Sequence, residues 1–249
     1  MLTILRGLGR GLLELGFPAR CAACGARLGE GQALCDLCAL SLEPPGPAAC
    51  GRCGEPLAGA PPPGVDPRCG RCLAAPPAFT VARARYRHEG AVATAIRRFK
   101  FGDHPELAGP LGALLAPALG AALAAGAEVV VPVPLHPRRL REREYNQALL
   151  LAARAVRHLG RGGVAAPAPE RAALRRVRDT DPQIGLTPAQ RAANVRGAFV
   201  AAPARVAGRA VLLVDDVLTT GATADACAAA LRAAGARSVE VLTLSRAVQ

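Results

Sequence analysis

Aromatic residues are scarce in this chain of 249 residues, which has no tryptophan, two tyrosines and five phenylalanines. Proteins that bind single-stranded nucleic acid without sequence preference stack its bases on aromatic side chains. A platform built by base stacking would therefore be thin here. The net charge of +12 and the pI near 10.3 nevertheless favour a polyanionic or phosphorylated partner, because long-range attraction raises its local concentration.

The chain also lacks an export signal, because Arg6, Arg10 and Glu14 interrupt the leading apolar residues. No stretch free of charge is expected to reach the length of a transmembrane helix. We therefore expect a cytoplasmic protein. Residues 1–17 place six leucines near one helical face but include four glycines, so this N-terminal helix is expected to dock on its own protein. Peripheral contact with a membrane surface is the alternative.

Eight of the nine cysteines lie before residue 73, as four C-x-x-C pairs: Cys21/Cys24, Cys35/Cys38, Cys50/Cys53 and Cys69/Cys72. Two such pairs present four thiolates to one tetrahedral zinc ion, so the pattern predicts two structural Zn²⁺ sites. Sequential pairing needs the shortest loops, and a cross-braced arrangement is the alternative. A disulfide framework would suit a secreted chain. The ninth cysteine, Cys227, is expected to be a small core residue.

Composition divides the chain after these cysteines. We predict an N-terminal helix over residues 1–17, a double zinc-ribbon module over residues 18–75 and a larger domain over residues 79–249. The segment 18–75 is too rich in proline and glycine to fold on its apolar content alone, so zinc is expected to hold it together.

Strand and helix patterns alternate through the larger domain. Strands are expected over residues 79–86, 128–133, 170–176, 198–200, 211–214 and 238–244, and helices over residues 91–101, 107–125, 138–159 and 222–235. Residues 178–196 are polar and too long for a turn, which is typical of a functional or disordered loop. The alternation predicts an α/β fold with a mainly parallel sheet flanked by helices.

The most informative segment is VLLVDDVLTTGAT, residues 211–223. Its apolar start suits a buried parallel strand, and a helix is expected after the Thr/Gly turn, which is where open α/β sheets bind ligands. No Gly-Lys-Ser/Thr follows the strand, so a Walker A loop is disfavoured. Gly221 lets backbone approach a phosphate, and the first helical N–H groups have no internal partner. The residues predicted to bind a 5′-phosphate are Thr219, Thr220, Gly221, Ala222 and Thr223.

Two acids precede that turn. Asp215 and Asp216 offer acceptor oxygens to the two hydroxyls of a ribose, and they are the predicted catalytic residues. An ordinary strand that ends in a polar turn is the alternative. No Ser/His/Asp nucleophile arrangement is apparent, and of the four histidines only His136 lies in a candidate site.

A second strand-to-helix turn has the sequence Pro132-Val133-Pro134 and is followed by arginines. A rigid turn of this kind can hold pyrophosphate, because arginine binds phosphate oxygens in bidentate fashion. The residues predicted to bind pyrophosphate are Pro132, Val133, Pro134, Arg139, Arg143, Asn146 and Gln147. Arg138 and Arg141 are expected on a solvated basic face.

A third segment contains Gln183, Arg191 and Asn194. We predict that it forms a flexible loop that closes over a reacting sugar and excludes water, which would otherwise hydrolyse a ribosyl oxocarbenium ion. A disordered basic connection is the alternative.

Together these motifs resemble the ComF family, the competence-associated proteins with a phosphoribosyltransferase-like domain. The resemblance covers the four zinc knuckles, Lys100-Phe101-Gly102, the Pro-x-Pro turn, Asn146-Gln147 and residues 215–223. Glu144-Tyr145 departs from the pattern, because the family usually has Gly followed by Phe or Trp there. The resemblance implies a type I phosphoribosyltransferase core behind a zinc module, with phosphoribosyl pyrophosphate (PRPP) and Mg²⁺ as ligands and a role in DNA uptake during natural competence.

Two functions fit these residues. In the first, the protein transfers a phosphoribosyl group from Mg·PRPP to an unknown acceptor. In the second, the same pocket senses a phosphoribosyl ligand without catalysis, while zinc knuckles and arginines hold single-stranded DNA or a competence helicase-like protein. The same fold serves both enzymes and regulators, so fold alone does not separate these functions.

Overall fold

A computed structural model describes residues 19–29, 32–59, 62, 64–102, 104–180 and 187–248 of the chain. The central sheet has four parallel strands in the order β1-β6-β5-β2: β1 (Val81–Arg87), β2 (Val129–Pro132), β5 (Ala210–Leu218) and β6 (Ser238–Arg246). A separate antiparallel pair consists of β3 (Leu174–Arg176) and β4 (Phe199–Ala201). The expected helix over residues 1–17 falls on residues 1–18, which lie outside the described part, and Gln183 falls outside it too.

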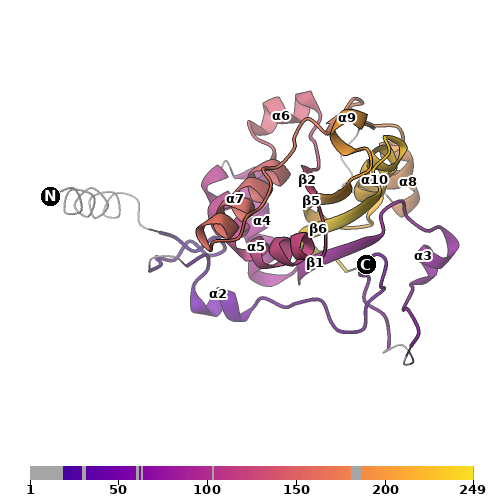
Figure 1. The fold of residues 1–249 in the computed structure, drawn as a ribbon. Coiled ribbons are helices and arrows are strands. Elements are labelled where there is room, and N and C mark those ends of the chain that lie inside the picture. Colours follow the sequence, from indigo (N-terminus) through magenta and orange to yellow (C-terminus); the bar gives the residue numbers. More distant parts are fainter. Residues whose placement is uncertain are drawn as a thin grey trace.

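Helices cover both faces of this sheet (Figure 1). The helices are α2 (Asp36–Leu40), α3 (Gly70–Ala74), α4 (Gly90–Phe101), α5 (Ala108–Ala124), α6 (Pro137–Arg143), α7 (Gln147–Arg161), α8 (Pro188–Val195), α9 (Pro203–Val206) and α10 (Ala222–Ala233), with a 3-10 turn over Pro105–Leu107. The layer of α4, α5 and α7 lies on one face, and α8 and α10 lie on the other with the β3–β4 pair. This arrangement confirms the predicted α/β class with its mainly parallel sheet.

The core residues of β5 alternate between the two faces. Val211 and Leu213 pack into the core beneath α10, whereas Leu212 and Val214 pack into the core beneath α5 and α7. Successive strand residues point to opposite faces, so a strand covered on both sides needs a continuous apolar run. That requirement explains the apolar run at residues 211–214.

The single helix expected over residues 138–159 is wrong. The segment forms α6 and α7, because Glu144 adopts the left-handed conformation with φ of 61° and ends α6. Asn146 then caps α7, and its Oδ1 accepts a hydrogen bond from the N–H of Leu149 at 3.0 Å. The helical pattern of leucines and arginines runs across this break, so periodicity alone conceals it.

Two further expectations need correction. Residues 178–196 are not wholly a loop, because Pro188–Val195 is helix α8, which begins with a capping box of Thr187 and Gln190. The statement that no charge-free stretch reaches transmembrane length is also wrong, since Pro105–Ala124 is long and apolar enough by composition. In this fold α5 is a core helix, because Leu111, Leu115 and Leu119 are fully buried.

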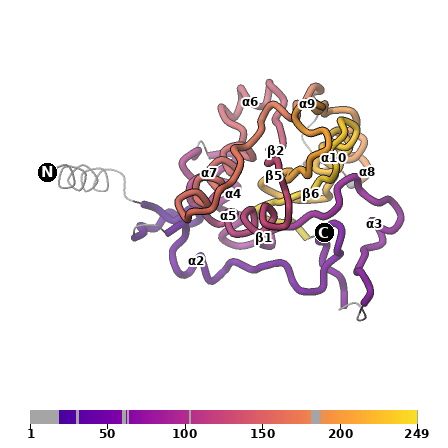
Figure 2. Tube along the Cα trace, viewed as in Figure 1, coloured from indigo at the N-terminus to yellow at the C-terminus, as the bar shows by residue number. Residues whose placement is uncertain are grey.

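The cysteine-rich segment covers the outer edge of β1. The N–H of Ala82 donates to the carbonyl of Arg52 at 2.7 Å, and the N–H of Arg87 donates to the carbonyl of Glu43 at 2.7 Å. Figure 2 shows the indigo trace running along β1 between α2 and α3. An exposed edge strand is a template for aggregation, so this segment protects the sheet.

The left-handed residue between α6 and α7 makes a first prediction. Glu144→Gly is expected to raise the free energy of unfolding by about 0.5–1 kcal/mol, because a non-glycine residue costs about 1–2 kcal/mol in this conformation and glycine loses part of that gain in backbone entropy. Urea unfolding of the two proteins measures the difference. A variant less stable than the wild type would show that the Glu144 side chain stabilises the turn.

Candidate functional site

A cavity of about 430 Å³ lies where β2 and β5 end and the helices that follow them begin. Its size is within the range of small-molecule sites. Lining residues come from the ends of these strands, from α4, α6 and α7, and from Arg176 of β3 and Arg191 of α8. Open α/β sheets bind ligands at this end of their strands.

The two predicted acids lie within β5, since the strand continues to Leu218 beyond its apolar run. Both line the cavity. Asp216 is 5% exposed, and its Oδ1 lies 2.8 Å from Nζ of Lys100 on α4. Burial and then the negative charge of Asp216 raise the pKa of Asp215 to about 7, although Lys100 and Arg176 act in the opposite direction. The site thus holds one ionised carboxylate beside one that titrates near neutral pH.

The glycine turn, which we define as residues 219–223, joins β5 to α10. Gly221 is the N-cap of α10 and has φ of 84°, a conformation that favours glycine. Thr219, Gly221 and Thr223 line the cavity, whereas Thr220 and Ala222 lie outside its lining. The Oγ1 of Thr220 instead accepts a hydrogen bond from the N–H of Ala222 at 3.3 Å. The turn therefore aims the N-terminus of a helix at the cavity, which suits an anion.

The proline turn, Pro132-Val133-Pro134, follows β2 on the other side of the cavity. Val133 and Pro134 line the cavity, and Pro132 is the last residue of β2. Asn146 holds this turn in place, because its Nδ2 donates to the carbonyl of Val133 at 3.1 Å while its Oδ1 caps α7. Sequence placed Asn146 among ligand-binding residues, and the structure adds this positioning contact.

Cations outnumber carboxylates around the cavity. The positively charged residues in its lining are Arg97, Lys100, Arg139, Arg143, Arg176 and Arg191, against Asp215 and Asp216. Burial lowers the pKa of Arg143 and of Arg176, and Asp216 and Asp215 partly offset this effect at the two arginines respectively. A cavity with this excess of guanidinium groups suits a ligand with several negative charges.

Gln147 provides a further sign of a polar ligand. Its side chain lines the cavity and is 3% exposed. Its Oε1 lies 3.5 Å from Nη1 of Arg143, while its buried Nε2 has no hydrogen-bond partner within the part of the chain that the structure describes. Native structures rarely leave such a donor unsatisfied.

Several cavity residues were missed from the sequence, notably His88, Arg97, Lys100 and Arg176. Lys100 offered a signal, since it is the only lysine of the chain. His88 offered none, because it lies at the end of β1, far in sequence from the strands that carry the turns. Its Nδ1 lies 2.8 Å from Oγ of Ser245, and burial, helped by Lys100, lowers its pKa.

The expectation that His136 is the histidine of the site is wrong. The Nδ1 of His136 caps α6 by accepting from the N–H of Arg138 and lies 3.5 Å from Asp179, outside the cavity lining. Arg138, expected on a solvated face, is largely exposed and pairs with Asp179 at 2.9 Å. Of the third segment, Arg191 lines the cavity, whereas the carbonyl of Asn194 accepts from Arg178 at 2.9 Å.

The eight N-terminal cysteines form two clusters whose sulfur atoms lie within 4.8 Å of one another: Cys21, Cys24, Cys35 and Cys38 in one, and Cys50, Cys53, Cys69 and Cys72 in the other. This is the sequential pairing. Burial raises the pKa of Cys21 and of Cys50, but backbone N–H groups that bond to each sulfur outweigh it and bring each pKa to about 6. Four thiolates at this separation fit two structural zinc sites.

One arginine ties each ribbon to the larger domain. In the first ribbon, residues 21–38, the carbonyls of Cys21, Ala22 and Ala23 accept bonds of 3.0–3.2 Å from Arg98 of α4. In the second ribbon, residues 50–72, the carbonyl of Cys53 accepts a bond of 2.5 Å from Arg246 of β6. The zinc module is therefore built into the same framework as the cavity.

Comparison with known proteins gives two family matches. A model described as a double zinc ribbon domain matches residues 12–73, and one described as a phosphoribosyl transferase domain matches residues 146–247. Among solved structures, TT1426 from Thermus thermophilus is 20% identical with a TM-score of 0.31, covering 57% of this chain and 83% of that chain.

Relatives match over most of their length. Competence protein F of Haemophilus influenzae is 31% identical over 204 residues, which is 80% of this chain and 84% of that protein. DNA utilization protein YhgH of Salmonella typhimurium is 32% identical over 218 residues, covering 86% and 90% respectively. The protein of the same name in Escherichia coli is 31% identical over 235 residues, covering 92% and 97%.

The raised pKa of Asp215 makes a second prediction. The folded protein keeps a proton on Asp215 up to about pH 7, whereas the unfolded chain releases it near the ordinary value of 3.8. This contribution to stability is therefore present at low pH and lost as the pH rises through about 7. Asp215→Asn should be more stable than the wild type, by a margin that grows from about pH 4 to about pH 7 and then levels off. Urea unfolding across this range tests it, and a constant margin would contradict it.

Proposed function

Because the chain belongs to the ComF family of competence and DNA utilization proteins, we propose that it binds Mg·PRPP and transfers the phosphoribosyl group to an acceptor nitrogen. The observation that carries this proposal is the convergence on one cavity of the glycine turn, two strand carboxylates and the arginines that follow the proline turn. These groups match a 5′-phosphate, a ribose and a pyrophosphate in the order in which PRPP joins them.

In this proposal the glycine turn holds the 5′-phosphate through the N–H groups at the start of α10. Asp215 and Asp216 accept hydrogen bonds from the ribose hydroxyls. The proline turn, Arg139 and Arg143 hold the pyrophosphate. Magnesium bound with the substrate supplies charge neutralisation at the leaving group. Rate enhancement comes mainly from positioning and from electrostatic stabilisation of the separating charges.

The strand order indicates where the acceptor enters. Displacement at the anomeric carbon forms a bond to nitrogen as the bond to the pyrophosphate oxygen breaks, so the acceptor approaches opposite the pyrophosphate. The proline turn follows β2 at one edge of the sheet, and His88 follows β1 at the other. We assign His88 as the base that takes the proton of the attacking nitrogen, because burial favours its neutral imidazole.

A second candidate function is a competence module that senses a phosphoribosyl ligand and holds single-stranded DNA or a helicase-like partner in the cytoplasm. The net charge of +12 and the names of the YhgH relatives favour it. Electrostatic DNA binding weakens steeply with salt. DNA binding that depends on surface arginines, survives Asp215→Ala and is not accompanied by PRPP turnover would support this module over the enzyme.

Calorimetric titration with PRPP and Mg²⁺ tests the proposed ligand. We expect micromolar binding to the wild type and at least ~10-fold weaker binding to Asp216→Asn, because the isosteric amide cannot offer a charged acceptor to the ribose. Arg138→Gln serves as the matched control, since this exposed arginine lies outside the cavity lining. Absence of binding to a folded wild-type protein would refute the proposal.

Substitution of His88 tests the assigned base. In acceptor screens that follow pyrophosphate release, His88→Asn should lower kcat by about 10²-fold or more and leave the affinity for PRPP nearly unchanged, because the base acts only on the acceptor. The wild-type rate should fall below the pKa of His88 as the imidazole gains a proton. An equal loss of PRPP affinity would instead assign His88 a structural role.

A further inference from the structure

We propose that the second ribbon positions the glycine turn, so that its zinc-bound fold sets the affinity of the turn for a phosphate. This inference rests on the proposed function of the turn. It concerns contacts that lie outside the cavity, on the side of the turn that carries Thr220 and Ala222. The second ribbon contacts the chain both before and after the turn.

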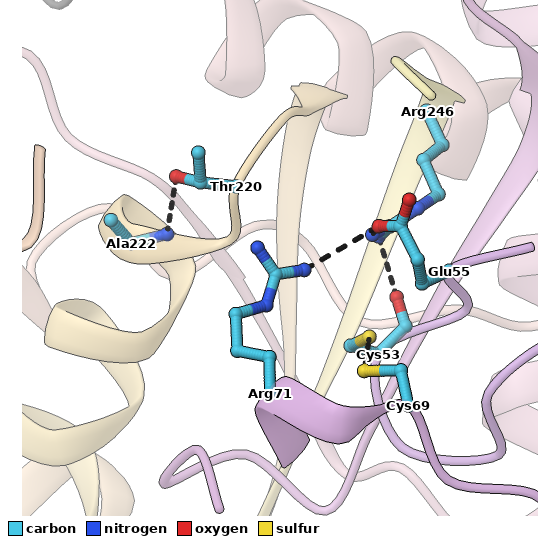
Figure 3. A network of polar contacts seen from close by, with 7 residues as sticks. All are labelled: Cys53, Glu55, Cys69, Arg71, Thr220, Ala222 and Arg246. Carbon is cyan, nitrogen blue, oxygen red and sulfur yellow. Dashed lines mark hydrogen bonds and ion pairs between the residues drawn. The ribbon is translucent and has the colours of Figure 1, made fainter. Parts of the chain in front are cut away.

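The contact before the turn is made by Arg246, at the end of β6. Its backbone pairs with Leu218, the residue that precedes the turn, and the N–H of Ala247 donates to the carbonyl of Leu218 at 2.9 Å. Its side chain, in a residue only 2% exposed, donates to the carbonyl of Cys53 at 2.5 Å and pairs with Glu55. One buried arginine therefore joins a zinc ligand to the strand end that leads into the turn (Figure 3).

The contact after the turn is made by Asp225, in the first turn of α10. Its Oδ1 accepts a hydrogen bond of 2.6 Å from the N–H of Ala78, in the linker that leaves the second ribbon. Its own N–H donates to the carbonyl of Gly221 at 2.8 Å. Arg52 fixes the linker to the ribbon through a bond of 2.7 Å to the carbonyl of Pro77. The linker is thus held on one side by the ribbon and on the other by the helix that begins at the turn.

Arg71 completes the arrangement. It lies on α3, next to the ligand Cys72, and its Nη2 is 3.4 Å from Oε2 of Glu55. Figure 3 shows its guanidinium between Glu55 and the segment of Thr220 and Ala222. Glu55 therefore receives Arg71 from within the ribbon and Arg246 from the sheet. Loss of the metal would release this carboxylate and the Cys53 carbonyl together.

A turn that binds phosphate through backbone N–H groups depends on its conformation more than on its side chains. Gly221 has the widest choice of conformations, so the turn needs support from outside to keep φ near 84°. The first ribbon contacts α4 through Arg98 and not β5 or α10 in this way. The two ribbons of one chain therefore give a matched comparison.

The first experiment compares Arg246→Gln with the control Arg98→Gln, each with two zinc ions confirmed by native mass spectrometry. Amide hydrogen exchange of the peptide that spans the turn reports its conformation without any ligand. We expect faster exchange in Arg246→Gln and unchanged exchange in Arg98→Gln. Calorimetry with ribose 5-phosphate should then show about tenfold weaker binding for Arg246→Gln, and a change within about twofold for Arg98→Gln.

Asp225→Ala and Glu55→Gln provide milder variants in case Arg246→Gln does not fold, and each should also speed exchange of the turn. The zinc arm compares Cys72→Ser with Cys38→Ser, and only the former should loosen the turn. Unchanged exchange in the folded variants would overturn the inference even if the wild type binds ribose 5-phosphate. Faster exchange in a protein whose wild type binds no phosphate would refute the proposed function and leave the positioning role standing.

Discussion

Two adjacent carboxylates at the buried end of a central strand are the constraint on which the rest of the site depends. Asp215 and Asp216 sit between helical layers, where desolvation disfavours their charge. The protein compensates by placing Lys100 on one side and Arg176 on the other. These cations come from α4 and β3, and this explains why elements distant in sequence meet at the end of β5.

The zinc module solves a different problem, which is how a small segment poor in apolar residues can hold a fixed position. Cys21 belongs to the core beneath α4 and α5, whereas Cys50 and Cys53 belong to the core beneath α10. The segment between them covers the edge of β1. Metal–thiolate bonds therefore replace a hydrophobic core of the ribbons' own and let each ribbon brace one face of the sheet.

Much of the architecture could be predicted because its signals are local. The cysteine spacing identified two clusters, and the apolar run with its Thr/Gly turn identified β5, the turn and α10. The break at Glu144 and helix α8 were missed, since the first hides within a helical pattern and the second lies in a polar stretch. The mistaken choice of His136 over His88 has the same origin, because sequence proximity to a motif is a poor guide to contact across a sheet.

The sequence by itself determined the fold class, the metal ligands and the residues of the two turns, because each depends on residue type at short spacing. Only the tertiary structure decided which residues face the cavity. It separated Thr219 from Thr220 within one turn and brought Lys100 to Asp216. It also joined Cys53 to Arg246, 193 positions away. Such contacts follow from strand order and from burial of charge, which no local pattern of residues specifies.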